Sequence, residues 1–198
     1  MALSCGSRVR ASELEYIGNM AGSELLQCWH DYSRELADAF SAAQPELRVP
    51  WAGPPMSAQS SIIARLMETW AHGQAIFDFL GVERKNSDHI YSIAELGVRT
   101  YRWTFANRQL DAPLPKPFVR LTAPSGKLWS WNEEREDEYV EGEAVEFCQV
   151  VTQTRNVKDT SLNVSGSNAA KWMSIAQCFA GPPETPPAKG QRMIKKAR

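Results

Sequence analysis

The stretch WAGPPMSAQSSIIARLMETWAHGQAIFDFLG, residues 51–81, decides the fold of this chain. Its Gly-Pro-Pro segment predicts a turn, Ser57 is a typical helix N-cap, and Gly81 stands where helices commonly end. The pattern therefore predicts a helix from Ser57 to Leu80. The strongest apolar stripe of this helix, which we expect to face the core, consists of Ile62, Leu66, Trp70, Gly73, Phe77 and Leu80.

Glu68 and His72 lie four residues apart in the predicted helix. Since an α-helix has about 3.6 residues per turn, both side chains project from the same face, roughly a third of a turn from the apolar stripe. A carboxylate beside an imidazole can bind a divalent metal ion, act as an acid–base pair, or form a surface ion pair worth about 0.2–0.5 kcal/mol. The spacing leaves these interpretations open, and a metal site would need a third ligand from another helix.

Three further side chains are weighed for the same site. His30 follows Trp29 in the preceding predicted helix and is the candidate third metal ligand, the alternative being a histidine on the flank of that helix. Arg65 lies one turn before Glu68, where it could orient a substrate carboxylate, support Glu68, or form an i,i+3 ion pair with it. His89 falls in the first turn of a later helix, and we expect it at the surface.

Composition limits the classes of protein that this chain can represent. Its 198 residues are 43% apolar, which is enough for one compact domain or two small ones. The net charge of −1 gives no general attraction to nucleic acid or to an anionic membrane. No apolar run approaches the roughly 20 residues needed to span a bilayer, and the N-terminus lacks the apolar core of a secretory signal. We therefore expect a cytoplasmic protein without nucleic-acid or membrane partners.

The four cysteines predict neither a zinc ribbon nor a thioredoxin-like motif, because no C-x-x-C pair is present. Cys28, Cys148 and Cys178 each occur within an apolar helical pattern, where a reduced cysteine is usually a small core residue. Nucleophile elbows, phosphate-binding loops and dinucleotide fingerprints are also absent from the sequence. The sequence thus leaves open whether the protein is an enzyme.

Residues 23–109 are predicted to form a helical domain, preceded by a weakly ordered N-terminus at residues 1–22. In addition to the helix of the opening stretch, the pattern predicts one helix from an N-cap at Ser23 to just before Pro45 and another from Ser87 to about Asn107.

Residues 110–182 are predicted to form a small α/β domain. The alternating prolines of LDAPLPKP (110–117) place the domain boundary, because proline is excluded from helix interiors. Residues 183–198 are proline-rich and then basic without apolar periodicity, which predicts a disordered tail. The elements predicted within the domain are two strands in 118–132, an acidic loop at 133–138, a helix from Gly142, a strand at 162–166 and a helix from Ser167 to Phe179.

Five stretches of the chain carry a resemblance to known proteins: GPPMSAQSSIIARLMETWAHGQ (53–74), ELGVRTYRW (95–103), LTAPSGKLWSW (121–131), EFCQVVTQTR (146–155) and IAQCFAGPP (175–183). Together they resemble an uncharacterised metal-binding family in the superfamily of DinB-like proteins and mycothiol-dependent maleylpyruvate isomerases. The likeness covers about residues 23–183.

The resemblance implies an α+β fold, in which an antiparallel up-down helical bundle that holds a divalent metal ion is followed by a small α/β domain. Glu68 and His72 match the E-x-x-x-H pair that supplies two metal ligands on one helix. In the superfamily a further histidine comes from an earlier helix, but residues 1–22 contain no histidine. We therefore expect an incomplete DinB-like bundle without its first helical hairpin, which is completed by a second chain, reduced to a remnant, or explained by a misassigned start.

The resemblance further implies a metal-binding protein that acts on a small molecule as a thiol-dependent transferase or isomerase. Zinc is the expected ion, with nickel or iron as alternatives, and mycothiol or another low-molecular-weight thiol is the expected cosubstrate. Glu68, His72 and His30 would be the metal ligands, and Arg65 would contact the substrate or cofactor. The alternative is a non-catalytic small-molecule-binding or assembly module, such as a homodimer, that has lost the complete metal site.

Overall fold

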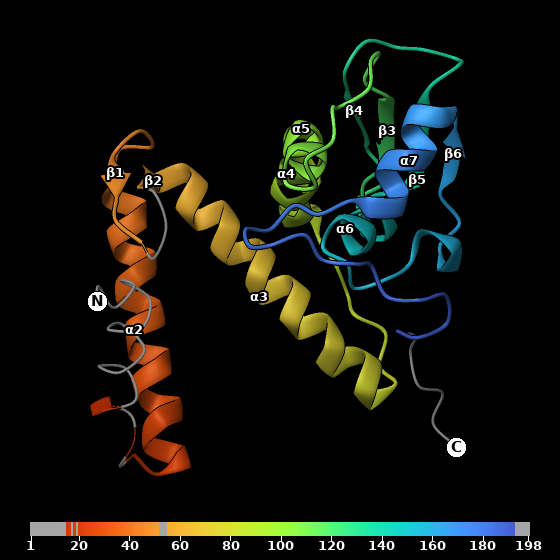
Figure 1. Cartoon of the computed structure of the whole chain (residues 1–198). Coiled ribbons are helices and arrows are strands. Elements are labelled where there is room, and N and C mark those ends of the chain that lie inside the picture. Colours follow the sequence, from red (N-terminus) through yellow and green to blue (C-terminus); the bar gives the residue numbers. More distant parts are fainter. Residues whose placement is uncertain (1–14, 17, 19, 52–54, 193–198) are drawn as a thin grey trace, which may run out of the picture. The chain divides into compact units, whose positions relative to one another are not determined.

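The computed structural model describes residues 15–16, 18, 20–51 and 55–192 of the chain. The chain divides into two compact units between Ile62 and Ile63, inside one long helix. Helices together with a four-stranded mixed sheet confirm the predicted α+β class (Figure 1). No described helix is both long and apolar enough to cross a membrane. The predicted domain boundary at 110–117 stays a prediction, as does the incomplete bundle.

The first unit is built around α2 (Gly22–Ala42), which confirms the long helix predicted before Pro45. Its N-terminus differs from the prediction, because Ala21 and not Ser23 is the N-cap. The Ala21 backbone N–H donates to the Glu24 carboxylate over 2.8 Å. An acidic side chain in the first turn therefore stabilises the end of the helix that carries unpaired backbone donors.

Helix α3 (Ala58–Leu80) follows a short antiparallel ribbon made of β1 (Arg48–Val49) and β2 (Met56–Ser57). Ser57 caps α3 as predicted, since its hydroxyl oxygen accepts a hydrogen bond from a backbone N–H one turn later, over 3.1 Å. Gly81 follows the helix with a φ of 68°, a left-handed conformation that glycine adopts without steric cost. The helix predicted from the opening stretch is confirmed at both ends.

The buried face of α3 differs from the predicted apolar stripe. Trp70 is buried as expected, but Ile62 and Leu80 of the stripe remain 39% and 61% exposed. Two polar side chains, Gln74 and Asp78, lie on the buried face instead. A stripe drawn from apolar residues alone cannot include Gln74 and Asp78, whose burial depends on their bond to each other and on the pairing of Asp78 with Arg155.

The helix predicted from Ser87 to about Asn107 is divided into η1 (Asp88–Ile90), α4 (Tyr91–Arg99) and α5 (Tyr101–Ala106). The break between α4 and α5 lies at Thr100. Its hydroxyl donates to two backbone carbonyls of the preceding turn, over 2.8 and 3.0 Å. Such bonds compete with the helical ladder and bend helices, which the apolar periodicity does not reveal.

The second unit contains a mixed sheet of β3 (Phe118–Thr122), β4 (Leu128–Trp131), β5 (Tyr139–Glu143) and β6 (Asn163–Ser165), in the order β4-β3-β5-β6. The two central strands, β3 and β5, run parallel, and each outer strand is antiparallel to its neighbour (Figure 1). The strands predicted within 118–132 and 162–166 are therefore confirmed.

The prediction is wrong at β5, because Gly142 lies in this strand and does not begin a helix. Val140 is the one fully buried residue of β5, and Glu141 pairs with Arg120 of β3 over 2.7 Å. So few apolar positions give no alternating pattern to recognise. Gly142 is required by its φ of 143° and by Leu162, whose Cδ2 atom would lie 2.9 Å from a Cβ at this position.

Helix α6 (Ala144–Val151) packs on the central strands β3 and β5 and also contacts α4. Phe147 and Cys148 are completely buried within it. Gly97 of α4 permits the close approach of the two helices, since a Cβ at this position would lie 2.8 Å from Val151 Cγ2. The core of the second unit is therefore organised around α6.

Helix α7 (Ser167–Ile175) follows η2 (Val157–Asp159) and β6, and it ends four residues before the predicted end at Phe179. Its N-terminus is capped by Glu138, which is 8% exposed. The Glu138 carboxylate accepts hydrogen bonds from the first free backbone N–H groups of α7, over 3.1 and 2.9 Å. A buried carboxylate at this position is stabilised by the helix dipole.

Candidate functional site

Glu68 and His72 come together on one face of α3, as their spacing predicts. The Glu68 Oε2 and His72 Nε2 atoms are 3.4 Å apart. Both side chains are open to solvent, with 51% and 85% of their surface exposed. An ion pair this exposed contributes on the order of 0–1 kcal/mol to stability. The contribution of the pair to folding is therefore small, and its donor atoms are accessible to a ligand.

The two donor atoms have suitable types and spacing for one divalent ion, but their number is too small. Tetrahedral zinc with bonds of about 2.0–2.1 Å places neighbouring ligand atoms about 3.3 Å apart, close to the separation of Glu68 and His72. Zinc sites use three or four protein ligands. Within residues 15–16, 18, 20–51 and 55–192, no three His, Cys, Asp or Glu side chains are grouped to hold a metal ion. The described residues therefore form no complete metal site, and a metal ion held by Glu68 and His72 stays a prediction.

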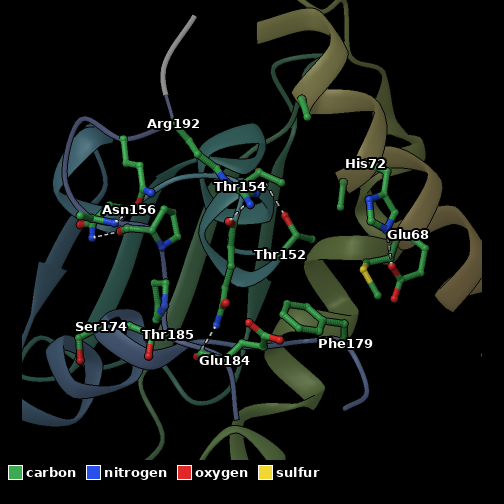
Figure 2. Close-up of a pocket in the computed structure, with 18 of the residues that line it drawn as sticks. Glu68, His72, Thr152, Thr154, Asn156, Ser174, Phe179, Glu184, Thr185 and Arg192 are labelled. Carbon is green, nitrogen blue, oxygen red and sulfur yellow. Dashed lines mark hydrogen bonds and ion pairs between the residues drawn. The ribbon is translucent and has the colours of Figure 1, made fainter. Parts of the chain in front are cut away.

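Glu68 and His72 also line a cavity of about 1060 Å³ in the second unit. Figure 2 shows the pair on one side of this cavity and the side chains of Thr152 and Thr154 opposite. Ligand pockets of small-molecule-binding proteins measure about 300–1,000 Å³, so this cavity has room for a small molecule. The lining comes from α3 (Met67, Glu68, Ala71, His72 and Ala75), from Thr152, Gln153, Thr154 and Asn156, from Ser174, and from residues between 179 and 192.

Residues 152–156, here named the wall segment, begin where α6 ends. Gln153 adopts a φ of 55° in this segment, a left-handed conformation that is uncommon for residues other than glycine. Its side-chain amide donates to the carbonyls of Ala176 and Glu184, over 2.9 and 3.1 Å. The buried Gln153 side chain therefore ties the wall segment to the backbone at Ala176 and at Glu184.

Asp78 of α3 forms a buried ion pair with Arg155 of the wall segment. Burial acts to raise the pKa of Asp78, but the hydrogen bonds from Arg155 and Gln74, and the positive charges of Arg155 and Arg192, outweigh it. The pKa of Asp78 therefore lies below its ordinary value. The carboxylate is therefore charged at neutral pH although it lies on the buried face of α3.

Residues 179–192, here named the C-terminal segment, contribute a further side of the cavity. Gln177 donates to the carbonyl of Pro182 over 3.0 Å, and Asn156 donates to the carbonyl of Pro187 over 2.7 Å. The sequence predicts disorder for most of this segment, whereas the structure holds it against the second unit. Asn156 is distant in sequence from the segment that it holds, so the proline-rich composition does not reveal the contact.

Cys178 immediately precedes the C-terminal segment and is 5% exposed. Burial, and to a lesser extent the negative charge of Glu68, raises the pKa of its thiol well above the ordinary value. Burial likewise raises the pKa of Cys148. Both thiols remain protonated at neutral pH and behave as the core residues that the sequence predicts, whereas Cys28 of α2 is half-buried.

The other predicted site residues lie outside the lining of the cavity. His30 belongs to α2 in the first unit, where its ring centroid lies 5.1 Å from that of Trp29, and its role as third ligand stays a prediction. Arg65 is exposed on α3, and no ion pair among the described residues joins it to Glu68. A contact of Arg65 with substrate or cofactor also stays a prediction. His89 is exposed, as expected.

The sequence did not single out the polar residues of the wall segment as candidates for the site. A signal for them exists, because a run of hydroxyl and amide side chains, TQTRN at 152–156, directly follows the apolar helix α6. Thr152 donates to a backbone carbonyl of α6 over 2.7 Å, which orients its side chain at the edge of the cavity. Apolar periodicity identifies the helix but gives no role to the polar residues that follow it.

A known protein family matches the part of the chain that carries Glu68 and His72. Residues 18–77 match the mycothiol maleylpyruvate isomerase N-terminal domain family. This isomerase N-terminal domain match includes α2, the ribbon and most of α3. The predicted resemblance is confirmed at this level, whereas metal binding stays a prediction.

Two curated proteins of Mycobacterium tuberculosis are similar to the chain over a longer stretch. They are "Uncharacterized protein Rv0036c" of strain ATCC 25618 / H37Rv and "Uncharacterized protein MT0041" of strain CDC 1551 / Oshkosh, each 43% identical over 161 residues. The match covers 81% of this chain and 63% of each relative, so the chain spans less than two thirds of the length of these relatives. No solved structure matches the chain. The homology extends beyond the isomerase N-terminal domain, but neither relative's name states an activity.

Proposed function

We propose that this protein binds a divalent metal ion, zinc in the first place, through Glu68 and His72, and a small polar molecule in the adjoining cavity. The observation that carries the proposal is the 3.4 Å approach of two metal-ligand side chains that line a cavity of about 1060 Å³. Nickel and iron are the alternative ions, because imidazole and carboxylate suit them as well. The third ligand comes from His30, from the bound molecule or from a second chain.

The reaction that we assign to this site is a thiol-dependent transfer or isomerisation, with mycothiol or another low-molecular-weight thiol as cosubstrate. The support is the match of residues 18–77 to a family named for a mycothiol maleylpyruvate isomerase. A bound divalent ion supplies Lewis acidity and lowers the pKa of a coordinated thiol or water. The chain's own residues would hold the ion and position the molecule against Thr152 and Thr154, which line the cavity.

Metal content by elemental mass spectrometry and calorimetric titration with Zn²⁺ test the metal site. We expect close to one equivalent of Zn²⁺ per chain and a loss of affinity of about tenfold or more in His72→Ala and in Glu68→Gln, because each removes one of the two proposed ligands. His30→Ala should reduce the affinity by a similar factor if His30 is the third ligand, and leave it unchanged if a bound molecule or second chain supplies that ligand.

His89→Ala is the matched control, since it removes another exposed histidine that does not line the cavity. This variant should retain the affinity of the parent for Zn²⁺. Equal losses in His89→Ala and His72→Ala would contradict the assignment. Absence of bound metal in the parent after incubation with excess Zn²⁺, Ni²⁺ and Fe²⁺ would overturn it.

The second candidate is a non-catalytic small-molecule-binding or assembly module, and α2 favours it. No residue of this 21-residue helix is buried, and Leu25, Trp29 and Tyr32 are 42%, 59% and 54% exposed. A homodimer that covers α2 would bury these side chains. Sedimentation velocity over a wide concentration range, combined with metal analysis, separates the candidates. A concentration-dependent dimer without metal supports the module, and a monomer with one bound Zn²⁺ supports the metal-dependent function.

The proposal places the protein in the cytoplasm, where it acts on a small molecule and not on nucleic acid. The net charge of −1 supports the exclusion of nucleic acid, since nucleic-acid-binding proteins present a strongly basic face. Salt-sensitive retention of RNA in a filter-binding assay would contradict it.

A further inference from the structure

The buried ion pair between Asp78 and Arg155 joins two sides of the cavity. Arg155 Nη1 donates to Asp78 Oδ2 over 2.6 Å, and Nη2 donates to Asp78 Oδ1 over 2.5 Å. The side chains of Arg155 and Asp78 are 6% and 12% exposed. The contact is therefore bidentate and almost fully desolvated, the geometry in which an arginine fixes both the distance and the orientation of a carboxylate.

Each partner of the pair is also tied to its own segment. Arg155 Nη1 donates to the backbone carbonyl of Thr154 over 2.7 Å, so the guanidinium bridges the wall segment and α3. On the helix, Gln74 donates to Asp78 Oδ1 over 3.0 Å. Among the described hydrogen bonds, those of Arg155 to Asp78 are the ones that connect α3 to the wall segment.

Asp78 belongs to the same helix as the two side chains of the proposed metal site. Asp78 follows His72 by six residues on α3, which corresponds to about 9 Å along the helix axis. Thr152, Thr154 and Asn156, which line the cavity, all lie within three residues of Arg155. The contact therefore joins the wall segment, whose side chains line the cavity, to the helix that carries Glu68 and His72.

We infer that Asp78 and Arg155 are positioning residues, which hold the wall segment at the distance from α3 that a bound small molecule requires. The inference rests on the proposed function, because it assigns the cavity of that proposal to a ligand. Its prediction is specific: the pair controls the order of the wall segment, and it does not control the Glu68–His72 donors, which are set within α3 by their own spacing.

Removal of one charge tests the pair poorly, because the charge left behind in the interior destabilises the whole protein. The double variant Asp78→Leu/Arg155→Met avoids this problem, since it replaces the pair by apolar side chains of similar size, an exchange that buried ion pairs often tolerate. Arg155→Lys keeps the charge and loses the bidentate geometry. The matched control is Arg135→Met/Asp137→Leu, which removes the ion pair of a surface loop.

Hydrogen–deuterium exchange followed by mass spectrometry is the deciding measurement. We expect the amides of the wall segment to exchange at least about tenfold faster in Asp78→Leu/Arg155→Met, while those of α7 keep the parent rate. Arg155→Lys should give an intermediate rate, and the Arg135/Asp137 control should match the parent at both positions. If the pair serves only general stability, amide exchange should rise throughout the second unit of a destabilised double variant. It should rise nowhere if the double variant is as stable as the parent.

Binding of Co²⁺ alone, followed by its visible absorption, separates this inference from the proposed function. We expect the double variant to bind Co²⁺ with an affinity within about twofold of the parent, because both donors lie on one helix. Parental exchange rates in the wall segment of the double variant would overturn the inference, as would loss of cooperative unfolding in that variant. A parent that binds no Co²⁺ would overturn the metal proposal, while the exchange rates would still decide the role of the pair.

Discussion

Helices α2 and α6 lie in opposite environments. Five of the eight residues of α6 are buried, and Phe147 has no exposed surface. None of the 21 residues of α2 is buried, and Trp29 is 59% exposed. The shorter helix therefore contributes far more to the core of its unit than the longer one does to its own.

The difference shows what an apolar stripe can and cannot establish. In α6 all residues except Glu146 and Gln149 are apolar, so most of the helix circumference is apolar and must be covered. In α2 the apolar positions are interrupted by Asp31, Glu35 and Asp38, so one side can remain in water. A stripe predicts a helix, whereas an apolar circumference also predicts that the helix is buried.

Phe147→Ala in α6 should give the largest loss in the free energy of unfolding. The side chain is completely buried, and its ring centroid lies 5.7 Å from that of Trp172. Loss of the buried ring and the cavity left behind should lower the free energy of unfolding by about 3–5 kcal/mol. Urea unfolding monitored by tryptophan fluorescence measures this change. A loss below about 1 kcal/mol would show that α6 is not the centre of the core.

Gly97→Ala should have the next largest effect, because a Cβ at this position would lie 2.8 Å from Val151 Cγ2 and 3.0 Å from Phe147 Cε1. The forced separation of α4 and α6 should cost about 1–3 kcal/mol and outweigh the better helix propensity of alanine. Gly22→Ala on α2 is the matched control, since no atom lies within 4 Å of its Cβ position. Urea midpoints of both variants test the prediction, and equal stabilisation in the two would contradict the close packing.

A similar contrast between local and distant contacts explains how much of the fold the sequence could predict. Helix α3 was predictable because Ser57 and Gly81 mark its ends by local chemistry. The strand β5 was not, because its place in the sheet depends on a parallel partner and on the Arg120–Glu141 pair, which are not local in sequence. Local signals set the ends of elements, and distant partners decide which elements pair.

The candidate site follows the same division. Glu68 and His72 were predictable, since four-residue spacing places both on one helical face. The wall segment was not, because Gln153 is held in a left-handed conformation by carbonyls at 176 and 184. The part of the site that lies within one helix is readable from the sequence, whereas the conformation of the wall segment, which depends on tertiary hydrogen bonds, is not.

Glu138→Gln should have a smaller effect than either core substitution, because it changes a helix cap and not the packing. The carboxylate accepts hydrogen bonds from the backbone N–H groups of Asn168 and Ala169. A neutral amide retains one acceptor oxygen, so we expect a loss of about 1–2 kcal/mol. Asp137→Asn is the matched control, since its side chain is 66% exposed and pairs with Arg135 at the surface. Urea unfolding should show a clear loss for the first variant and little change for the second.

Trp29→Ala in α2 should have the smallest effect on the free energy of unfolding. A side chain that is 59% exposed leaves no cavity, so the free energy of unfolding should change by no more than about 0.5 kcal/mol at low protein concentration. If a second copy covers α2, the loss should grow with protein concentration, because only the dimer buries the indole. Urea midpoints measured at low and high concentration separate these cases. A loss above about 1 kcal/mol at low concentration would mean that Trp29 packs against its own chain, and α2 would then resemble α6 more than its exposure indicates.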